Sequence, residues 1–342
     1  MQKVRVAIAG MGRAAMSIHI PALRKISEAE IVGFFDPVQS ASDFQSFPTL
    51  DALLATSPDV LVIATPPSSH LPIALKALKA GAHVFCEKPL ANSVAEADIL
   101  VEAAACARRH VSVNSEFPFM AMHLAATQEI GSERFGQLLF VEVHQTFVVT
   151  DKTEDGWRGA DPQRTFKEFG THVIDLCKTF FGERPIAMSA RMPRPLLNSG
   201  PDYLNLIRLE FSGDRVAQIT LDRVTKGRHR YLDLRLVGDR GTIETSLGGS
   251  ADVKIGLRPK GRTPFAEMNL HLGGVARLYH GERSITLGKA PLDLYPDASA
   301  RLYRAFFKAL ADGSEPPNSV AEARDTLALI YRAYEEAEAG AP

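Results

Sequence analysis

A glycine-rich turn that follows an apolar stretch constrains this chain more than any other feature of its sequence. Residues 4–9 read Val-Arg-Val-Ala-Ile-Ala, and residues 10–15 continue as Gly-x-Gly-x-x-Ala. This pattern predicts a buried strand, a tight turn at Gly10 and a helix that packs closely on the strand at Ala15. Gly12 has no Cβ, so a pyrophosphate can approach the backbone there, beside the free N–H groups of the helix start.

Strands and helices alternate over the first third of the chain. Four more apolar strands are predicted, at Glu30–Asp36, Asp59–Ala64, His83–Cys86 and His110–Asn114. Helices are predicted between them, at Ala14–Ile26, Thr49–Ala55, from Ser68 or Ser69 to Ala80, and at Ser93–Arg109. Because Pro21 lies inside the first helix, we expect a kink there or two short pieces. The alternation predicts a doubly wound parallel sheet of the Rossmann type.

Polar and glycine residues gather at the ends of these strands. Ligands of doubly wound sheets bind outside the carboxyl ends of the strands. Gly10, Asp36, Thr65, Lys88 and Asn114 all lie at such ends. We therefore expect these five positions to surround a bound dinucleotide.

Asp36 indicates which dinucleotide is bound. It follows the glycine motif by about 20 residues, where a carboxylate can accept hydrogen bonds from both ribose hydroxyls of NAD. The same carboxylate would repel the 2′-phosphate of NADP, and no arginine follows closely. NAD is therefore the favoured cofactor. The alternative is that Asp36 is a turn residue before Pro37.

The second part of the chain has a different pattern. After a helix at Ala121–Ile130 come strands joined mostly by short turns, which predicts a large, open, mainly antiparallel sheet and closing helices at Ser299–Asp312 and Ser319–Ala339. The predicted strands are Leu138–Val149, Ile186–Arg191, Tyr203–Phe211, Val216–Val224, Tyr231–Val237 and Gly241–Ser246. The segment 248–294 is expected to be irregular, with one or two short strands. We place a nucleotide-binding domain at 1–118 and an α+β domain at 119–342.

Composition excludes several classes of partner. With 39 basic and 40 acidic residues the net charge is −1, which argues against nucleic acid and acidic membranes. No stretch reaches the roughly 18 apolar residues that a membrane span needs, and the chain starts without a leader pattern. The three cysteines, an odd number, do not indicate a disulfide framework, so we predict a cytoplasmic location.

Two runs carry a resemblance to a known family. Residues 64–70 read Ala-Thr-Pro-Pro-Ser-Ser-His, and residues 80–90 read Ala-Gly-Ala-His-Val-Phe-Cys-Glu-Lys-Pro-Leu. They resemble the glucose–fructose oxidoreductase / inositol dehydrogenase / MocA family, in which Glu-Lys-Pro closes the fourth strand. The resemblance implies an NAD-dependent dehydrogenase of a secondary alcohol or ketone in a sugar, cyclitol or related polyol. It also implies a homodimer or homotetramer that associates through the second sheet.

The resemblance and the strand ends together give a set of cofactor-binding residues. These are Gly10, Gly12, Arg13, Ala14, Asp36, Thr65, Pro66, His70, Glu87, Lys88 and Asn114.

A predicted helix over residues 166–182 carries the remaining site residues. The family has a histidine after Gly-x and an acid four residues earlier beside the nicotinamide, which correspond here to His172 and Glu168. An imidazole can accept the hydroxyl proton, a carboxylate can orient it, and Lys88 can stabilise the developing alkoxide. Lys88, His172 and Glu168 are thus the predicted catalytic residues. Trp157 and Arg158, together with Lys88 and His172, are predicted to contact the substrate.

Each assignment has a simpler alternative. His172 can be structural, Lys88 can neutralise cofactor phosphates or pair with Glu87, and Glu168 can be a helix-terminal acid. Trp157 and Arg158 can be loop anchors. A metal site at Glu168, His172, Asp175 and Cys177 is not expected, because Cys177 points away around the helix and no second cluster completes a tetrahedral set.

Some positions depart from the family pattern. Glu168 stands where the family usually has aspartate, and Pro162-Gln163-Arg164 replace a glycine cluster. After the fifth strand an acid, Glu116, occupies a position where a base is common. These changes surround the substrate rather than the dinucleotide. Two alternative functions therefore stay open, a glycoside hydrolase that uses NAD transiently and a noncatalytic dinucleotide-binding sensor.

Overall fold

The computed structural model describes residues 3–38, 43–147, 163–194, 202–225, 231–248, 251–257, 264–270, 273–290 and 294–339. The chain divides into two compact units. Unit 1 comprises Met1–Phe119, Phe166–Asp175 and Tyr295–Glu335. Unit 2 comprises Met120–Thr165, Leu176–Leu294 and Glu336–Pro342.

A five-stranded sheet forms the centre of unit 1. Its order is β2-β1-β3-β4-β5, and every neighbouring pair is parallel, as the alternating pattern predicts. The chain runs outward from β1 to β2 and then crosses to β3 on the other side of β1. The carboxyl ends of β1 and β3 therefore form the switch point at which ligands of such sheets bind. The strands are β1 (Val4–Ala9), β2 (Ala29–Phe35), β3 (Val60–Ile63), β4 (His83–Cys86) and β5 (Val111–Val113).

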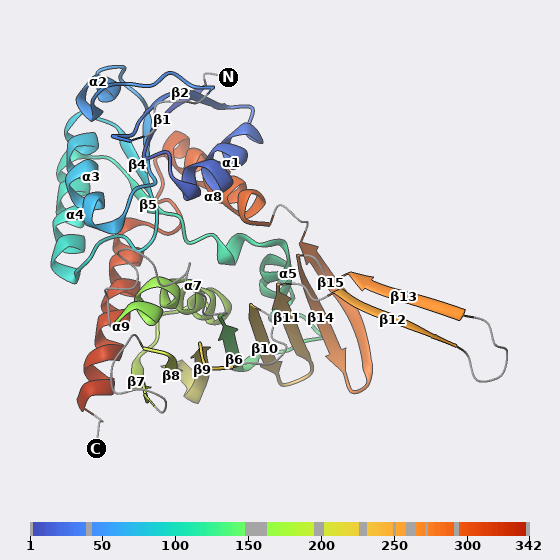
Figure 1. Cartoon of the computed structure of the whole chain (residues 1–342). Helices are drawn as coiled ribbons and strands as arrows, with labels where there is room; N and C mark the ends of the chain where they lie inside the picture. Colours follow the sequence, from blue (N-terminus) through green and yellow to red (C-terminus); the bar gives the residue numbers. More distant parts are fainter. Residues whose placement is uncertain are drawn as a thin grey trace. The chain divides into compact units, whose positions relative to one another are not determined.

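Helices cover both faces of this sheet (Figure 1). On one face the buried core joins α2 (Leu50–Leu54), α3 (His70–Lys79) and α4 (Val94–Ala107) to α9 (Val320–Ala339). On the other face the core joins the turn after β1 to α8 (Leu294–Asp312). The sheet thus buries apolar side chains on both sides, which explains why its strands read as continuous apolar runs.

The last helices of the chain belong to the first unit, contrary to the predicted boundary at 118/119. Tyr303 and Phe306 of α8 are buried in the core of one sheet face. Val320 and Leu327 of α9 are buried in the core of the other. The prediction placed both helices and residues 166–175 in the second domain, because proximity in sequence does not reveal which apolar face a late helix covers. The structure corrects this assignment.

The helix after the glycine turn consists of two pieces. A π-helical turn spans Ala15–His19, and α1 (Ile20–Arg24) follows with Pro21 in its first turn. Proline is tolerated there because its missing N–H would have no partner in the first turn. The wider π-helical turn accommodates an additional residue, and His19 at its end is fully buried.

An eight-stranded sheet dominates unit 2 and confirms the predicted open, mainly antiparallel sheet. Its order is β15-β14-β11-β10-β6-β9-β8-β7, and only β6 and β9 pair in parallel. Helix α5 (Ala121–Glu129) lies against β14 and β15, where a Cβ on Gly288 would come within 2.8 Å of Ala125 Cβ. The strands are β6 (Leu138–Thr146), β7 (Ala187–Arg191), β8 (Leu204–Phe211), β9 (Arg215–Asp222), β10 (Leu232–Gly238), β11 (Thr242–Leu247), β14 (Gly274–His280) and β15 (Arg283–Ala290).

The segment expected to be irregular contains four strands. Besides β14 and β15, β12 (Ala251–Leu257) and β13 (Pro264–Leu270) form a separate antiparallel pair. The alternation rule fails for β15 because its first four residues are all exposed, so neither face is marked by apolar side chains. The expectation of one or two short strands in this segment was therefore wrong.

Helix α7 (Arg164–Phe181) ends at Gly182, which has a positive φ of 68° and is the glycine C-cap that the sequence indicates. Its residues 166–175 belong to unit 1 and its last residues to unit 2. In the described part of the chain, no helix combines the length and the apolar character needed to cross a membrane.

We predict that Asp175 stabilises unit 1. Its carboxylate accepts hydrogen bonds from Ser115 Oγ (2.6 Å) and Thr326 Oγ1 (2.7 Å), all three residues being buried. Asp175→Ala leaves both hydroxyls without this acceptor and should lower the free energy of unfolding by about 2–4 kcal/mol. Denaturant unfolding measures the loss. Asp98→Ala, which removes an exposed ion pair with Arg324, is the control and should cost less; equal losses would contradict the prediction.

Candidate active site

The two glycines of the turn have different structural roles. Gly10 has a φ of +92°, and an added Cβ would lie 2.7 Å from both the carbonyl oxygen of Ala64 and Thr65 Cγ2. Gly10 therefore allows the ends of β1 and β3 to meet. An added Cβ on Gly12 would meet nothing within 4 Å. The backbone at Gly12 is open, so the turn fits the approach of a pyrophosphate.

Asp36 braces this turn from the end of β2. One carboxylate oxygen accepts a hydrogen bond from the backbone N–H of Met11 (2.7 Å). The other accepts one from the N–H of Val38 (2.8 Å). The carboxylate is thus fixed beside the glycine turn, and its predicted contact with a ribose stays a prediction.

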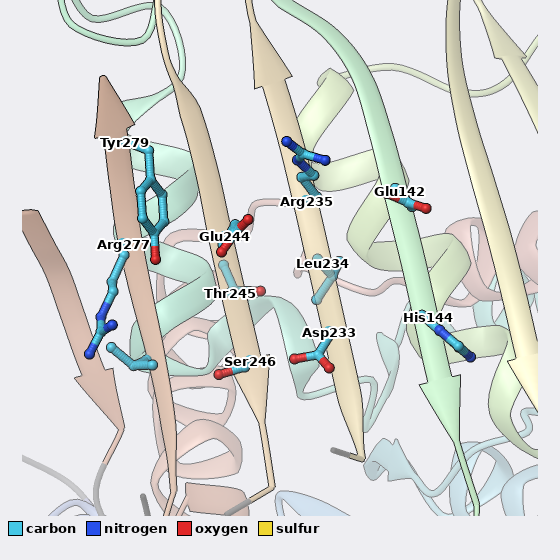
Figure 2. A pocket seen from close by; sticks show the side chains of 11 residues that line it. Glu142, His144, Asp233, Leu234, Arg235, Glu244, Thr245, Ser246, Arg277 and Tyr279 are labelled. Atoms are coloured by element: carbon cyan, nitrogen blue, oxygen red, sulfur yellow. The ribbon is translucent and has the colours of Figure 1, made fainter. Parts of the chain in front are cut away.

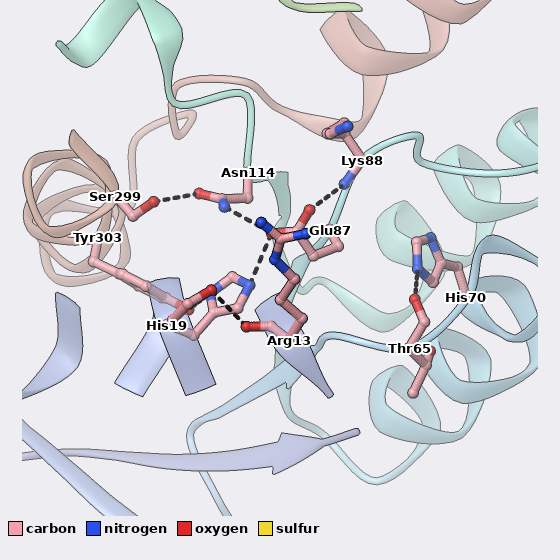
Figure 3. Close-up of polar contacts among 10 residues, drawn as sticks. Arg13, His19, Thr65, His70, Glu87, Lys88, Asn114, Ser299 and Tyr303 are labelled. Atoms are coloured by element: carbon pink, nitrogen blue, oxygen red, sulfur yellow. Dashed lines mark hydrogen bonds and ion pairs between the residues drawn. The ribbon is translucent and has the colours of Figure 1, made fainter. Parts of the chain in front are cut away.

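A buried polar network joins the ends of β4 and β5 to two helices (Figure 3). Glu87 Oε1 accepts hydrogen bonds from Asn114 Nδ2 (2.8 Å) and His19 Nε2 (3.0 Å). His19 Nδ1 lies 2.8 Å from the hydroxyl of Tyr303, and Asn114 Oδ1 accepts from Ser299 Oγ at 3.1 Å. Burial raises the pKa of Glu87, but the His19 contacts, the Lys88 charge and the Asn114 hydrogen bond outweigh it and hold the pKa well below its usual range.

His70 connects two strand ends instead of presenting a free ring. The side chain is fully buried, with Nδ1 2.9 Å from the carbonyl oxygen of Pro89 and Nε2 2.9 Å from that of Thr65 (Figure 3). Burial lowers its pKa. Three predicted cofactor residues, His70, Glu87 and Asn114, therefore have protein partners. We interpret them as supports of the cofactor-binding loops.

Lys88 meets helix α7 within unit 1. Its Nζ donates a hydrogen bond to the backbone carbonyl of Glu168 (3.0 Å) and lies 5.6 Å from the centre of the Phe169 ring. Two of the three predicted catalytic residues are thus in contact, although through a backbone oxygen instead of the Glu168 carboxylate. That contact fixes where the ammonium group lies.

His172 is held by stacking. Its side chain is buried, and its ring lies 3.9 Å from that of Phe117 with only 11° between the planes. Among the described residues Nδ1 has no hydrogen-bond partner, so the carboxylate expected to orient this ring does not do so. Burial, followed by the charge of Lys88, lowers the pKa of His172 well below its ordinary value. The imidazole is therefore neutral at physiological pH.

The remaining site predictions have mixed outcomes. Asp175, three residues after His172, accepts hydrogen bonds from Ser115 and Thr326. Trp157 and Arg158 lie outside the described residues. Within the described ranges no group of three or more His, Cys, Asp or Glu side chains could hold a metal ion. The predicted contacts of Arg13, Ala14, Thr65 and Pro66 with the cofactor stay predictions.

A buried acid that the sequence analysis did not assign to the site is Glu116. Its side chain is 4% exposed. Burial and the charge of Glu87 raise its pKa to about 8, against the smaller opposing effects of a backbone hydrogen bond and Lys88. The sequence indicated that Glu116 is unusual in one way only: it is an acid at a position where the family commonly has a base.

A separate hollow lies on the face of the sheet in unit 2 (Figure 2). Acidic and basic side chains alternate across it, since Glu142 opposes Arg235, Arg235 opposes Glu244, and Glu244 opposes Arg277 on successive strands. None of the predicted catalytic or cofactor residues lines it. The predicted catalytic residues Lys88 and His172 lie in unit 1.

Both parts of the chain match the models of one known protein family. Residues 4–115 match the model of an oxidoreductase family with an NAD-binding Rossmann fold. Residues 123–244 match the model of the GFO/IDH/MocA C-terminal domain. The chain belongs to the glucose–fructose oxidoreductase / inositol dehydrogenase / MocA family, and unit 1 contains its NAD-binding Rossmann domain. The resemblance inferred from the two sequence runs is confirmed.

Similar proteins include dehydrogenases of sugars and cyclitols. Glucose-6-phosphate 3-dehydrogenase of Bacillus subtilis is 30% identical over 199 residues, 55% of this chain and 56% of that protein, so the match spans about half of the relative. Inositol 2-dehydrogenase of Rubrobacter xylanophilus is 24% identical over 84% of this chain and 82% of its own length. An Agrobacterium radiobacter oxidoreductase solved with NAD+, L-tartaric acid and magnesium has the same fold, with a TM-score of 0.80, 18% identity and coverage of 99% and 98%.

The glycine geometry predicts opposite effects of two identical substitutions. Gly10→Ala forces a Cβ against Ala64 and Thr65 in a left-handed backbone, so it should destabilise the protein by about 2 kcal/mol or more. Gly12→Ala should leave the thermal midpoint near that of the wild type but weaken NAD binding, because the new methyl group lies where the phosphates approach. Thermal unfolding and calorimetric NAD titration measure both. Equal destabilisation by the two variants would refute this reading.

Proposed function

We propose that this chain is an NAD-dependent oxidoreductase that interconverts a secondary alcohol and a ketone in a sugar, cyclitol or related polyol. The observation that carries the proposal is the placement of Lys88. Lys88 follows Glu87 at the end of β4, and its ammonium group donates a hydrogen bond to the backbone carbonyl of Glu168. Glu168 and His172 lie on the same helix, α7. A fixed cation beside a nicotinamide can stabilise the oxygen of the reacting carbon.

In this proposal, residues of unit 1 bind the cofactor and position the substrate. Bound NAD supplies the hydride chemistry. Gly10 and Gly12 form the turn that accepts the pyrophosphate, and Asp36 faces the adenosine ribose. Lys88 donates a hydrogen bond to the substrate oxygen and stabilises its alkoxide character. His172, neutral and fixed against Phe117, offers a polar ring atom to a second substrate hydroxyl.

A preference for NAD over NADP is part of this proposal. The carboxylate of Asp36 holds the N–H groups of Met11 and Val38, so it is fixed where a 2′-phosphate would be repelled. Wild-type protein should therefore bind NADH at least about 10-fold more tightly than NADPH. Asp36→Ser should reduce this ratio, as measured by fluorescence titration of the two reduced nucleotides. Equal affinity of the wild type for both would rule out the proposed role of Asp36.

Lys88 should be required for turnover but not for cofactor binding. Lys88→Ala removes the group that stabilises the substrate oxygen, and kcat should fall by about 10²–10³-fold or more while NAD binding is retained. Lys76→Ala, which changes an exposed lysine of the same unit, should leave turnover unchanged. NADH absorbance with a panel of sugars and inositols provides the assay. Full activity of Lys88→Ala would contradict the mechanism.

One observation favours a second candidate, a noncatalytic dinucleotide-binding sensor. His172 has a strongly lowered pKa, and its Nδ1 has no orienting partner among the described residues. A sensor would bind NAD but turn over no alcohol, sugar or cyclitol in the panel. An NAD-using glycoside hydrolase would also give no net NADH but would cleave aryl glycosides, so NADH absorbance together with release of the aryl group separates all three functions.

Self-association through the sheet of unit 2 and a cytoplasmic location complete the proposal. The alternating charges around Arg235 and Glu244 give this sheet face a self-complementary pattern, which suits contact with a second copy (Figure 2). The odd number of cysteines, three in all, suits a reducing compartment. Sedimentation of the wild type and of Arg235→Glu measures the association, which should be weaker in the variant.

A further inference from the structure

Two buried carboxyl groups, Glu87 and Glu116, follow neighbouring strands of unit 1 but have different surroundings. Glu87 follows β4 and receives hydrogen bonds from His19, Asn114 and the backbone N–H of Lys88. Glu116 follows β5 and is 4% exposed. Its carboxyl group accepts a hydrogen bond from its own backbone N–H. Three donors from other parts of unit 1 thus hold Glu87 in its ionised form, whereas Glu116 is buried beside that charge.

The neighbours of Glu116 place it inside the candidate active site. Asn114 binds Glu87, and Ser115 binds Asp175 of helix α7. Phe117 stacks on His172 of the same helix. Residues on both sides of Glu116 therefore contact the elements that carry Lys88 and His172. A buried titratable side chain in these surroundings indicates a proton-transfer role.

Charged and titratable groups face Glu116 from three elements. Glu87 and Lys88 come from the end of β4, and Tyr295 comes from α8. On α7, His172 stacks on Phe117, the residue after Glu116. Burial and the negative charge of Glu116 raise the pKa of Tyr295 to about 12. The positive charge of Arg13, in the glycine turn, opposes this shift with a smaller effect. Because burial and then the negative charge of Glu87 raise the pKa of Glu116 to about 8, its carboxyl group keeps a proton at neutral pH. Environments that separate the pKa values of two carboxyl groups mark a base and an acid.

We propose that Glu116 is the proton carrier of this site. During alcohol oxidation the substrate O–H bond breaks and its proton passes to the Glu116 carboxylate. The C–H bonding pair leaves as hydride to the oxidised nicotinamide, and a C=O bond forms. Ketone reduction reverses each step, with the Glu116 carboxylic acid as the donor. The proposal rests on the function proposed above and assigns to Glu116 the role first predicted for His172.

His172 is less suited to this role because its environment opposes a positive charge. It is buried, stacked on Phe117 and close to the charge of Lys88, which together destabilise the imidazolium form. Protonation of the Glu116 carboxylate gives a neutral group, so proton uptake there creates no buried charge. A carboxyl group that titrates within about one unit of neutral pH also matches the requirement of general acid–base catalysis.

The first experiment needs no substrate. Infrared difference spectra of the full-length protein with bound NAD should show a protonated carboxyl band at pH 7 that disappears with a midpoint near pH 8. Glu116→Gln should remove this band, and Glu102→Gln, which changes an exposed glutamate of α4, should keep it. A spectrum in which Glu116→Gln removes no band at pH 7 would overturn the proposal.

The second experiment is the pH dependence of kcat/KM. Oxidation requires the carboxylate, so the wild-type rate should rise with pH and level off above about 8, whereas ketone reduction should fall over the same range. Glu116→Gln should lower the oxidation rate by about 10²-fold or more and abolish this dependence, and Glu116→Asp should restore part of both. His172→Asn should keep the dependence. If the pH dependence of kcat/KM persists in Glu116→Gln, the proposal is overturned.

The infrared titration and the pH dependence of kcat/KM test the role of Glu116 separately from the oxidoreductase function. Turnover by the wild type, with an unchanged pH profile in Glu116→Gln, refutes the role of Glu116 and leaves the oxidoreductase function intact. Absence of turnover across the whole panel of alcohols, sugars and cyclitols refutes the oxidoreductase function and the proton-carrier role with it. A titrating Glu116 band in that case would show only an isolated buried carboxyl group.

Discussion

The buried carboxylate of Glu87 is the interaction on which the geometry of unit 1 depends. Its two oxygens receive donors from the π-helical turn, from the end of β5 and from the backbone of Lys88. Through His19 and Asn114 the same network reaches Tyr303 and Ser299 of α8. A buried ion is tolerated only when donors surround it in this way. The position of Lys88 therefore depends on contacts that converge from four segments of the chain.

This saturation of one carboxylate also determines the electrostatics of its neighbours. Burial and the fixed negative charge of Glu87 make a second ionised carboxylate unfavourable nearby, so Glu116 retains its proton. Burial and the positive charge of Lys88 disfavour the imidazolium form of His172, so that ring stays neutral. An arrangement of one anion, one cation and two neutral groups results. Such an arrangement can move a proton with little change in the surrounding charge.

Local patterns in the sequence were sufficient to predict the parallel sheet, the glycine turn and the placement of Lys88 at a strand end. Each of these depends on residues that lie close together in the chain. The partner of His19 was not predictable, because Tyr303 lies 284 positions away and no local rule connects them. Strand β15 was not predicted for another reason. Its first four residues are all exposed, so the sequence shows no alternation of apolar and polar residues there. The site was therefore predictable as a set of strand ends, but not in its cross-connections.

Helical spacing explains the partial success at α7. Glu168 and His172 are four residues apart on α7, a spacing that predicts a shared face. It did not determine what else would reach that face. Phe117 arrives from the end of β5 and stacks on the imidazole, and Lys88 binds a backbone oxygen. Side-chain pairing within a helix is weak, at about 0.2–0.5 kcal/mol, so contacts from other elements override it.

The assignment of α8 and α9 to the first unit has a consequence for how the protein is made. The strands of the parallel sheet emerge first from the ribosome, but both covering layers include helices from the last 50 residues of the chain. Until those helices appear, apolar side chains on each face of the sheet stay exposed to water. The sheet of the nucleotide-binding unit therefore waits for its covering helices while most of unit 2 is translated, and during that time it must be kept from aggregating.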